Sequence, residues 1–211
     1  MHVIHKTEGF VLGSKNVREA DKYFYIYTRD FGLIGAFAQG VRKSASKLRG
    51  HLQDFSLVSL ELVQGREIWR ITGAQVFPPL LASPLEESSA RSLSWIEVRF
   101  LTEPVFQFLT NLSKLIRRLC PGEEKSEDLF GHLKEAHKFL SKGNPCSKED
   151  IQAFECVAVL KILNTLGYVG DSQNLSFFVT SVVDKSVLEK AKEKRRILVA
   201  EINNSIKESQ L

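Results

Sequence analysis

The hydrophobic pattern of the chain changes its period near residue 78. Before this point, short runs of Val, Ile, Phe and Tyr alternate with Gly, Asn and Asp at roughly ten-residue spacing, which predicts β-strands. After it, apolar residues recur with the helical period. Pro78 and Pro79 lie at the change and withdraw two backbone donors. The sequence therefore predicts an α+β chain with a β domain over residues 1–78 and a helical domain over residues 79–211.

Five short strands are expected in the first domain, over residues 7–13, 22–28, 33–39, 55–63 and 67–74. The pair Gln64-Gly65 predicts a tight turn between the last two strands, whereas the third and fourth strands are joined by a longer connection. This arrangement matches an OB-fold, a five-stranded Greek-key barrel that often binds oligonucleotides.

Helices are expected in the second domain over residues 84–100, 103–119, 126–141, 147–166 and 185–206. Ser83 and Ser147 are suited to N-caps, Pro84 to a first helical position and Gly167 to a helix end. The apolar run over residues 175–183 is ambiguous between helix and strand.

Positive charge is concentrated in the first domain. Residues 1–80 contain 11 lysines and arginines against 7 acidic residues, and the rest of the chain contains 18 of each. A basic module beside a neutral one indicates that the first contacts a polyanion and the second contacts protein.

Catalytic motifs are absent from the sequence. It contains no Walker A loop, GxSxG, HExxH or dinucleotide fingerprint. Its three cysteines, Cys120, Cys146 and Cys156, form no CxxC pair, and His132 and His137 point to different sides of one predicted helix. We therefore expect no enzyme activity, no metal and no cofactor.

Residues 39–50 carry the strongest local signal, namely four cations without an acid: Arg42, Lys43, Lys47 and Arg49. Interleaved serines and bracketing glycines predict a mobile loop that could wrap a phosphate backbone. The alternative is an ordinary solvated loop. If all four cations met phosphates, single-strand affinity would fall with a log-log salt slope of about −3.

Tyrosines 23, 25 and 27 alternate along one strand and therefore share one face. If they are exposed, Tyr23 and Tyr25 would stack nucleic-acid bases. The alternative is that the row is partly buried under the second domain or packed on a neighbouring strand. Trp69 is expected in the core.

A basic rim is predicted on the helix over residues 103–119. Lys114, Arg117 and Arg118 recur beside Leu112, Leu115 and Leu119, and such a rim along an apolar groove could receive an acidic, hydrophobic peptide tail. The alternative is the solvated edge of an amphipathic helix.

The first 75 residues resemble the RecO recombination-mediator family. The resemblance rests on an ordered, nearly gapless set of segments: Glu8-Gly9-Phe10-Val11-Leu12, Glu19, Thr28-Arg29-Asp30-Phe31-Gly32, Gln39-Gly40-Val41-Arg42-Lys43, Leu48-Arg49-Gly50 and Leu52-Gln53-Asp54-Phe55. The helical half matches more loosely, chiefly over residues 160–168.

This resemblance implies an OB-fold on a helical domain and a non-enzymatic role in DNA repair and homologous recombination. RecO proteins bind and anneal single-stranded DNA, contact the C-terminal tail of SSB, and with RecR help to load RecA. By this analogy Arg42, Lys43, Lys47 and Arg49 touch DNA, in its single-stranded and double-stranded forms. Placing the SSB tail at Lys114, Arg117 and Arg118 is our own hypothesis. The alternatives are an interaction scaffold and an RNA-binding OB-fold protein.

Two departures from the family pattern affect these expectations. Many members insert a four-cysteine zinc module after the helix that ends in Leu-Gly-Tyr, but residues 171–178 contain no cysteine here, so we expect no zinc. The C-terminal end is shorter and lacks the family's closing basic motif. No apolar run approaches the about 20 residues of a membrane span, and the start lacks a secretory signal. We therefore expect a cytoplasmic, nucleoid-associated protein without a membrane partner.

Overall fold

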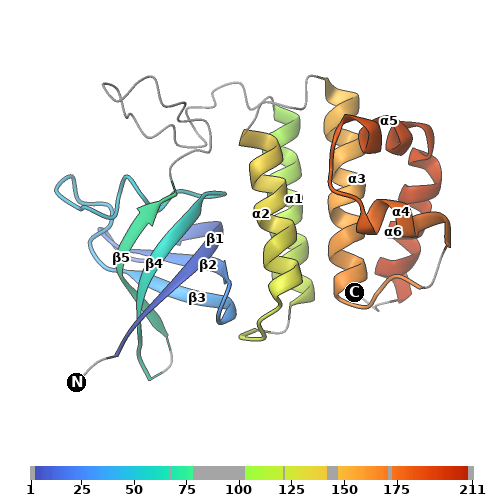
Figure 1. The fold of residues 1–211 in the computed structure, drawn as a ribbon. Coiled ribbons are helices and arrows are strands. Elements are labelled where there is room, and N and C mark those ends of the chain that lie inside the picture. Colours follow the sequence, from blue (N-terminus) through green and yellow to red (C-terminus); the bar gives the residue numbers. More distant parts are fainter. Residues whose placement is uncertain are drawn as a thin grey trace.

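The computed structural model describes residues 3–66, 68–77, 103–120, 122–141, 147–170 and 173–208. It confirms the α+β class: a closed five-stranded barrel precedes six described helices, and α1 and α2 separate the barrel from α3 (Figure 1). The helix expected over residues 84–100 and the domain boundary after residue 78 lie outside the described residues.

The barrel is built from β1 (Ile4–Asn16), β2 (Lys22–Thr28), β3 (Gly32–Ala38), β4 (Leu57–Gln64) and β5 (Trp69–Val76). The strand order is β1-β2-β3-β5-β4, with β1 also pairing with β4 and the β3–β5 contact parallel. This is the predicted OB-type arrangement.

Strand β1 is longer than predicted because it serves two neighbours. Its first half pairs with β4 and its second half with β2, with an irregularity between Val11 and Gly13 where it bends. Strand β5 begins at Trp69 and not at residue 67, and the Ile68 carbonyl just before it accepts from Gly65 N at 3.1 Å.

The helical domain consists of α1 (Glu103–Leu119), α2 (Glu127–Ser141), α3 (Lys148–Thr165), α4 (Gln173–Thr180), α5 (Lys185–Glu193) and α6 (Arg195–Glu208). The ambiguous run is therefore helical. The single late helix predicted over residues 185–206 was wrong, because the chain breaks at Lys194 (φ −97°, ψ 12°) and α5 and α6 then each pack on α3.

Two apolar cores meet at the barrel wall. One fills the barrel and includes Phe24, Ile26 and Trp69, which confirms the core position expected for Trp69. The other fills the helical bundle and includes Phe10 and Tyr27, whose side chains project from the outer face of the barrel. The two domains are thus joined by continuous apolar packing.

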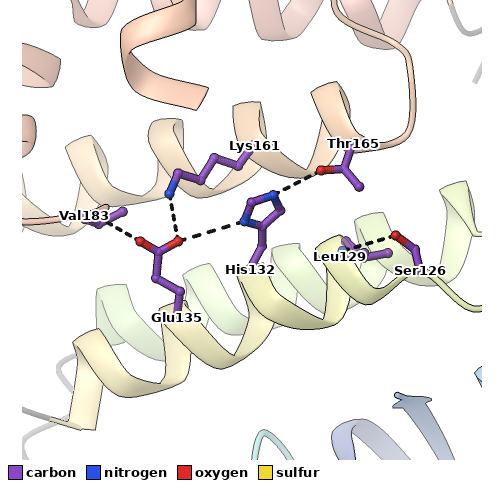
Figure 2. A network of polar contacts seen from close by, with 7 residues as sticks. All are labelled: Ser126, Leu129, His132, Glu135, Lys161, Thr165 and Val183. Carbon is purple, nitrogen blue, oxygen red and sulfur yellow. Dashed lines mark hydrogen bonds and ion pairs between the residues drawn. The ribbon is translucent and has the colours of Figure 1, made fainter. Parts of the chain in front are cut away.

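A polar network lies inside the helical bundle, between α2 and α3 (Figure 2). The buried Lys161 Nζ lies 2.7 Å from Glu135 Oε2, and Val183 N donates to Glu135 Oε1 at 2.8 Å. His132 lies beside this pair and contacts Thr165 Oγ1 through Nε2 at 3.0 Å. The network therefore fastens α2 to α3 and to the segment before α5.

The segment between α1 and α2 docks on the barrel through backbone and side-chain hydrogen bonds. Leu33 N donates to the Gly122 carbonyl at 3.1 Å, and Trp69 Nε1 donates to Glu123 Oε1 at 2.7 Å. These contacts, together with the shared core, fix the C-terminal end of α1 against strands β2 and β3.

Candidate nucleic-acid interface

The cationic segment is folded into consecutive turns. Backbone hydrogen bonds run from Lys43 to Gly40, from Ser46 to Lys43 and from Arg49 to Ser46, at 3.1 to 3.3 Å. The segment therefore follows a course of successive turns, and its four cations are exposed on it. Its mobility stays a prediction.

The start of this segment is pinned to the connection between β1 and β2. The buried Asp21 accepts from Gly40 N at 2.7 Å, and Arg42 N donates to the Ala20 carbonyl at 3.0 Å. Arg42 Nη1 also donates to the carbonyls of Glu19 and Arg18, at 2.8 and 3.3 Å. Arg42 thus shapes the segment, while its remaining N–H groups stay available to a ligand.

A hollow of about 300 Å³ opens between this segment and the start of β2. It is lined by Lys22, Arg42 and Arg49 and by the apolar side chains of Val41 and Leu52. Three cations without a carboxylate suit a phosphate group. Lys43 and Lys47 lie outside this lining. Lys22 was not predicted as a site residue, because it is far from Arg49 along the chain and only the folded barrel brings the two together.

The tyrosine row divides into an accessible half and a buried half. Tyr23 and Tyr25 are partly exposed, and their rings meet edge to face with centroids 5.2 Å apart. Lys15 Nζ lies 5.0 Å from the centre of the Tyr23 ring, and the Arg117 guanidinium lies 3.6 Å from that of Tyr25. Tyr27 is buried. The predicted stacking surface is thus reduced to two rings, each beside a cation.

The aromatic face continues onto β3. Tyr23 lies across Gly35, where a Cβ would clash with the tyrosine hydroxyl, so glycine allows the ring to lie on the sheet. The Arg18 guanidinium lies 5.9 Å from the centre of the Phe37 ring. Sequence reasoning missed Lys15, Arg18 and Phe37, although the alternation of β-strands places Phe37, which pairs with Tyr23, on the same face.

Tyr27 anchors the domain junction and takes no part in the open surface. Its hydroxyl accepts from Ser126 N at 3.2 Å. Burial, with a smaller contribution from the nearby Cys120, raises the pKa of Tyr27 to about 12, so this phenol stays protonated at neutral pH.

The cations predicted on the helix over residues 103–119 lie at the C-terminal end of α1 and face the barrel. Lys114, Arg117 and Arg118 are exposed, and with Tyr25 and Leu33 they line a shallow hollow of about 380 Å³. The hollow is therefore made by both domains.

The leucines expected beside these cations lie elsewhere. Leu112 and Leu119 are buried in the core, and Leu115 lines a separate hollow toward α3 and α6. Placement of an SSB tail at Lys114, Arg117 and Arg118 stays a prediction, without the apolar groove on which it relied.

Metal sites and membrane-spanning helices are absent from the described ranges. These ranges contain no group of three or more His, Cys, Asp and Glu side chains placed to hold a metal ion. No helix among them is long and apolar enough to cross a membrane. Cys120 and Cys156 are buried free thiols, and Cys146 lies outside these ranges.

The protein is of the class in which a closed five-stranded barrel of OB type is docked on a helical bundle. The barrel carries a basic segment and an aromatic face flanked by cations. Comparison with known proteins makes the class specific. Residues 1–79 match the family model described as Recombination protein O N terminal.

Curated relatives extend the similarity into the helical domain. The chain is 29% identical over 168 residues to a DNA repair protein RecO of Pelotomaculum thermopropionicum, covering 78% of this chain and 56% of the relative. It is 30% identical over 165 residues to one of Heliobacterium modesticaldum, covering 78% and 52%. A third, from Dehalococcoides mccartyi, is 38% identical over 76 residues, covering 36% and 30%.

Through its barrel, and through alignments that continue into its helices, the chain belongs to the RecO family. The resemblance found in the sequence is confirmed. The chain spans about half the length of the first two relatives, with 56% and 52% covered.

Proposed function

We propose that this protein acts in DNA repair and recombination by binding and annealing single-stranded DNA, without making or breaking covalent bonds. The observation that carries the proposal is the hollow of about 300 Å³ lined by Lys22, Arg42 and Arg49, which has room for a phosphate group and part of its nucleotide. It lies at the start of β2, where the Tyr23 and Tyr25 rings follow directly along the strand. Phosphate contacts beside stacking rings are what sequence-tolerant single-strand binding requires.

The finer role rests on family membership. We propose that the protein works with RecR, contacts the SSB C-terminal tail, helps to load RecA onto SSB-coated DNA, and releases annealed double-stranded DNA. The relatives are named DNA repair proteins, which supports the repair context.

The test is the salt dependence of single-strand binding in a variant that spares Arg42, because Arg42 also holds the segment in place. We call Lys43→Ala/Lys47→Ala/Arg49→Ala the loop triple. Arg49 lines the hollow, and Lys43 and Lys47 are exposed on the same segment, where the strand would leave it. Loss of these three phosphate contacts should reduce the log-log salt slope for oligothymidylate by about 2. Annealing of complementary strands should slow in parallel.

The matched control removes three exposed cations, one each from α3, the break between α5 and α6, and α6, which are elements separated from the barrel by α1 and α2 (Figure 1). We call Lys148→Gln/Lys194→Gln/Arg196→Gln the control triple. A loop triple that binds and anneals DNA like the control triple, with an unchanged circular dichroism spectrum, would refute the assignment. Tighter binding of RNA than of DNA of the same sequence would instead support the RNA-binding alternative.

A further inference from the structure

We infer that the hollow between the barrel and α1 is a second nucleotide-binding site, in which Lys114, Arg117 and Arg118 receive phosphates of the strand that crosses Tyr23 and Tyr25. This inference rests on the proposed function and extends it to the helical domain. The ligand is a continuous single strand, held by the barrel at one end and by α1 at the other.

The first argument is that the three cations are available. Within the described part of the chain, none of them forms an ion pair with a carboxylate. The helix dipole favours a cation at the end of α1. It does not account for a hollow that Tyr25 and Leu33 of the barrel complete from the other domain.

The second argument is the stacked pair of Arg117 and Tyr25. At 3.6 Å from the ring centre, the guanidinium lies on the tyrosine and leaves N–H groups at its edge for phosphate. Because the guanidinium covers one face of the Tyr25 ring, its own outer face is the surface that this pair offers to a base. This pair links the α1 cations to the Tyr23 ring, 5.2 Å from Tyr25.

The third argument is that contacts other than these three cations hold the two domains together. The shared apolar core, the Trp69–Glu123 hydrogen bond and the Lys134–Glu8 ion pair hold the domains together independently of the three cations. A purely structural role for the cluster is therefore unnecessary.

A nucleic acid suits this site better than an acidic peptide tail does. Such a tail needs an apolar groove for its hydrophobic residue, but the neighbouring Leu112 and Leu119 are buried in the core. The surface that the cations share with the barrel is aromatic and basic.

The experiment uses the full chain and a fluorescent oligothymidylate of about 25 nucleotides, long enough to exceed a single-barrel site. We call Lys114→Gln/Arg117→Gln/Arg118→Gln the α1 triple, and it should reduce the log-log salt slope by about 2 relative to the control triple. Combined with the loop triple, the two reductions should add. An unchanged slope and affinity relative to the control triple would overturn the inference.

A second variant separates stacking from charge. Arg117→Lys keeps the cation but removes the guanidinium plane, so the salt slope should hold while affinity falls about five-fold or more, and Tyr25→Leu should act in the same way. Unchanged affinity in both folded variants would overturn the stacking role.

The outcomes distinguish the two proposals. If the wild-type chain fails to bind oligothymidylate, the proposed function itself fails. If the wild type and control triple bind equally and the α1 triple matches them, only the second site fails. If the α1 triple instead loses a labelled acidic peptide with an aromatic end while keeping DNA, the cluster is a peptide site.

Discussion

Replacement of Glu135 by leucine tests the energetics of the network in Figure 2. Lys161 is 4% exposed, and its ammonium lies 2.7 Å from the carboxylate. Without Glu135 this buried charge and the Val183 amide lose their acceptor. Breaking a buried pair from one side typically costs about 3–5 kcal/mol. Because the Glu135 side chain is 24% exposed and water can enter, we expect a loss of about 3 kcal/mol in the free energy of unfolding.

The double variant Glu135→Leu/Lys161→Met decides whether the unpaired charge is the cause. Replacing both partners by apolar groups of similar volume is often close to neutral, so the second substitution should restore most of the stability lost in the first. The assay is urea unfolding followed by circular dichroism, with the midpoints compared at equal slope. A double variant no more stable than Glu135→Leu would refute this reasoning.

The same pair predicts an acid dependence of stability. Burial raises the pKa of Glu135, but the His132 imidazole, the Lys161 ammonium and the Val183 amide lower it from 4.5 to about 2. We assign Lys161 the larger share, since the His132 Nδ1 is 3.9 Å away, beyond hydrogen-bond distance. Because the folded pKa is depressed, the stabilisation is complete above pH 4.5 and is lost as the pH falls toward 2. The wild type should lose about 3 kcal/mol more than the double variant over this interval.

Three further substitutions test the docking, a matched helical glycine and the buried imidazole. Gly32 has φ 66°, and a Cβ there would clash with the Glu124 backbone. Gly32→Ala should therefore destabilise the protein by about 2 kcal/mol or more in thermal unfolding. Gly131 is exposed on α2, so Gly131→Ala should stabilise it by up to about 1 kcal/mol. Burial lowers the pKa of His137 from 6.5 to about 4, so the folded state favours the neutral ring. The free energy of unfolding should therefore decrease as the pH is lowered from 6.5 to 4, because the unfolded chain binds the proton first. His137→Phe should flatten that interval in urea unfolding, and an unaltered pH dependence would contradict the assignment.

Local patterns in the sequence were sufficient to predict the barrel and most helix positions. Strand alternation and glycine breaks are local, and the predicted β2 over residues 22–28 matches Lys22–Thr28. The break at Lys194 was missed because both flanking segments have helical patterns. The break follows from tertiary packing of α5 and α6 on α3, which no local period encodes.

The candidate site was only partly predictable for a related physical reason. Charge density identified residues 42–49, but not that Arg42 anchors the segment through the Glu19 carbonyl or that Lys22 completes the hollow. Both facts depend on how the strand ends meet in the closed barrel. The Arg117–Tyr25 contact depends further on the domain arrangement, so it could not be inferred from spacing along the chain.

The proposed second site depends on how the helical domain docks on the barrel. The backbone hydrogen bond from Leu33 to Gly122 and the tight approach of Gly32 to Glu124 fix the segment that follows α1 directly against β3. A shift of this segment would carry Arg117 away from Tyr25 and open the shared hollow. If the second site operates, Gly32→Ala should weaken binding of long single strands even though Gly32 lines neither hollow. Rigid docking of the helices on the barrel is then a requirement for holding a strand across both domains.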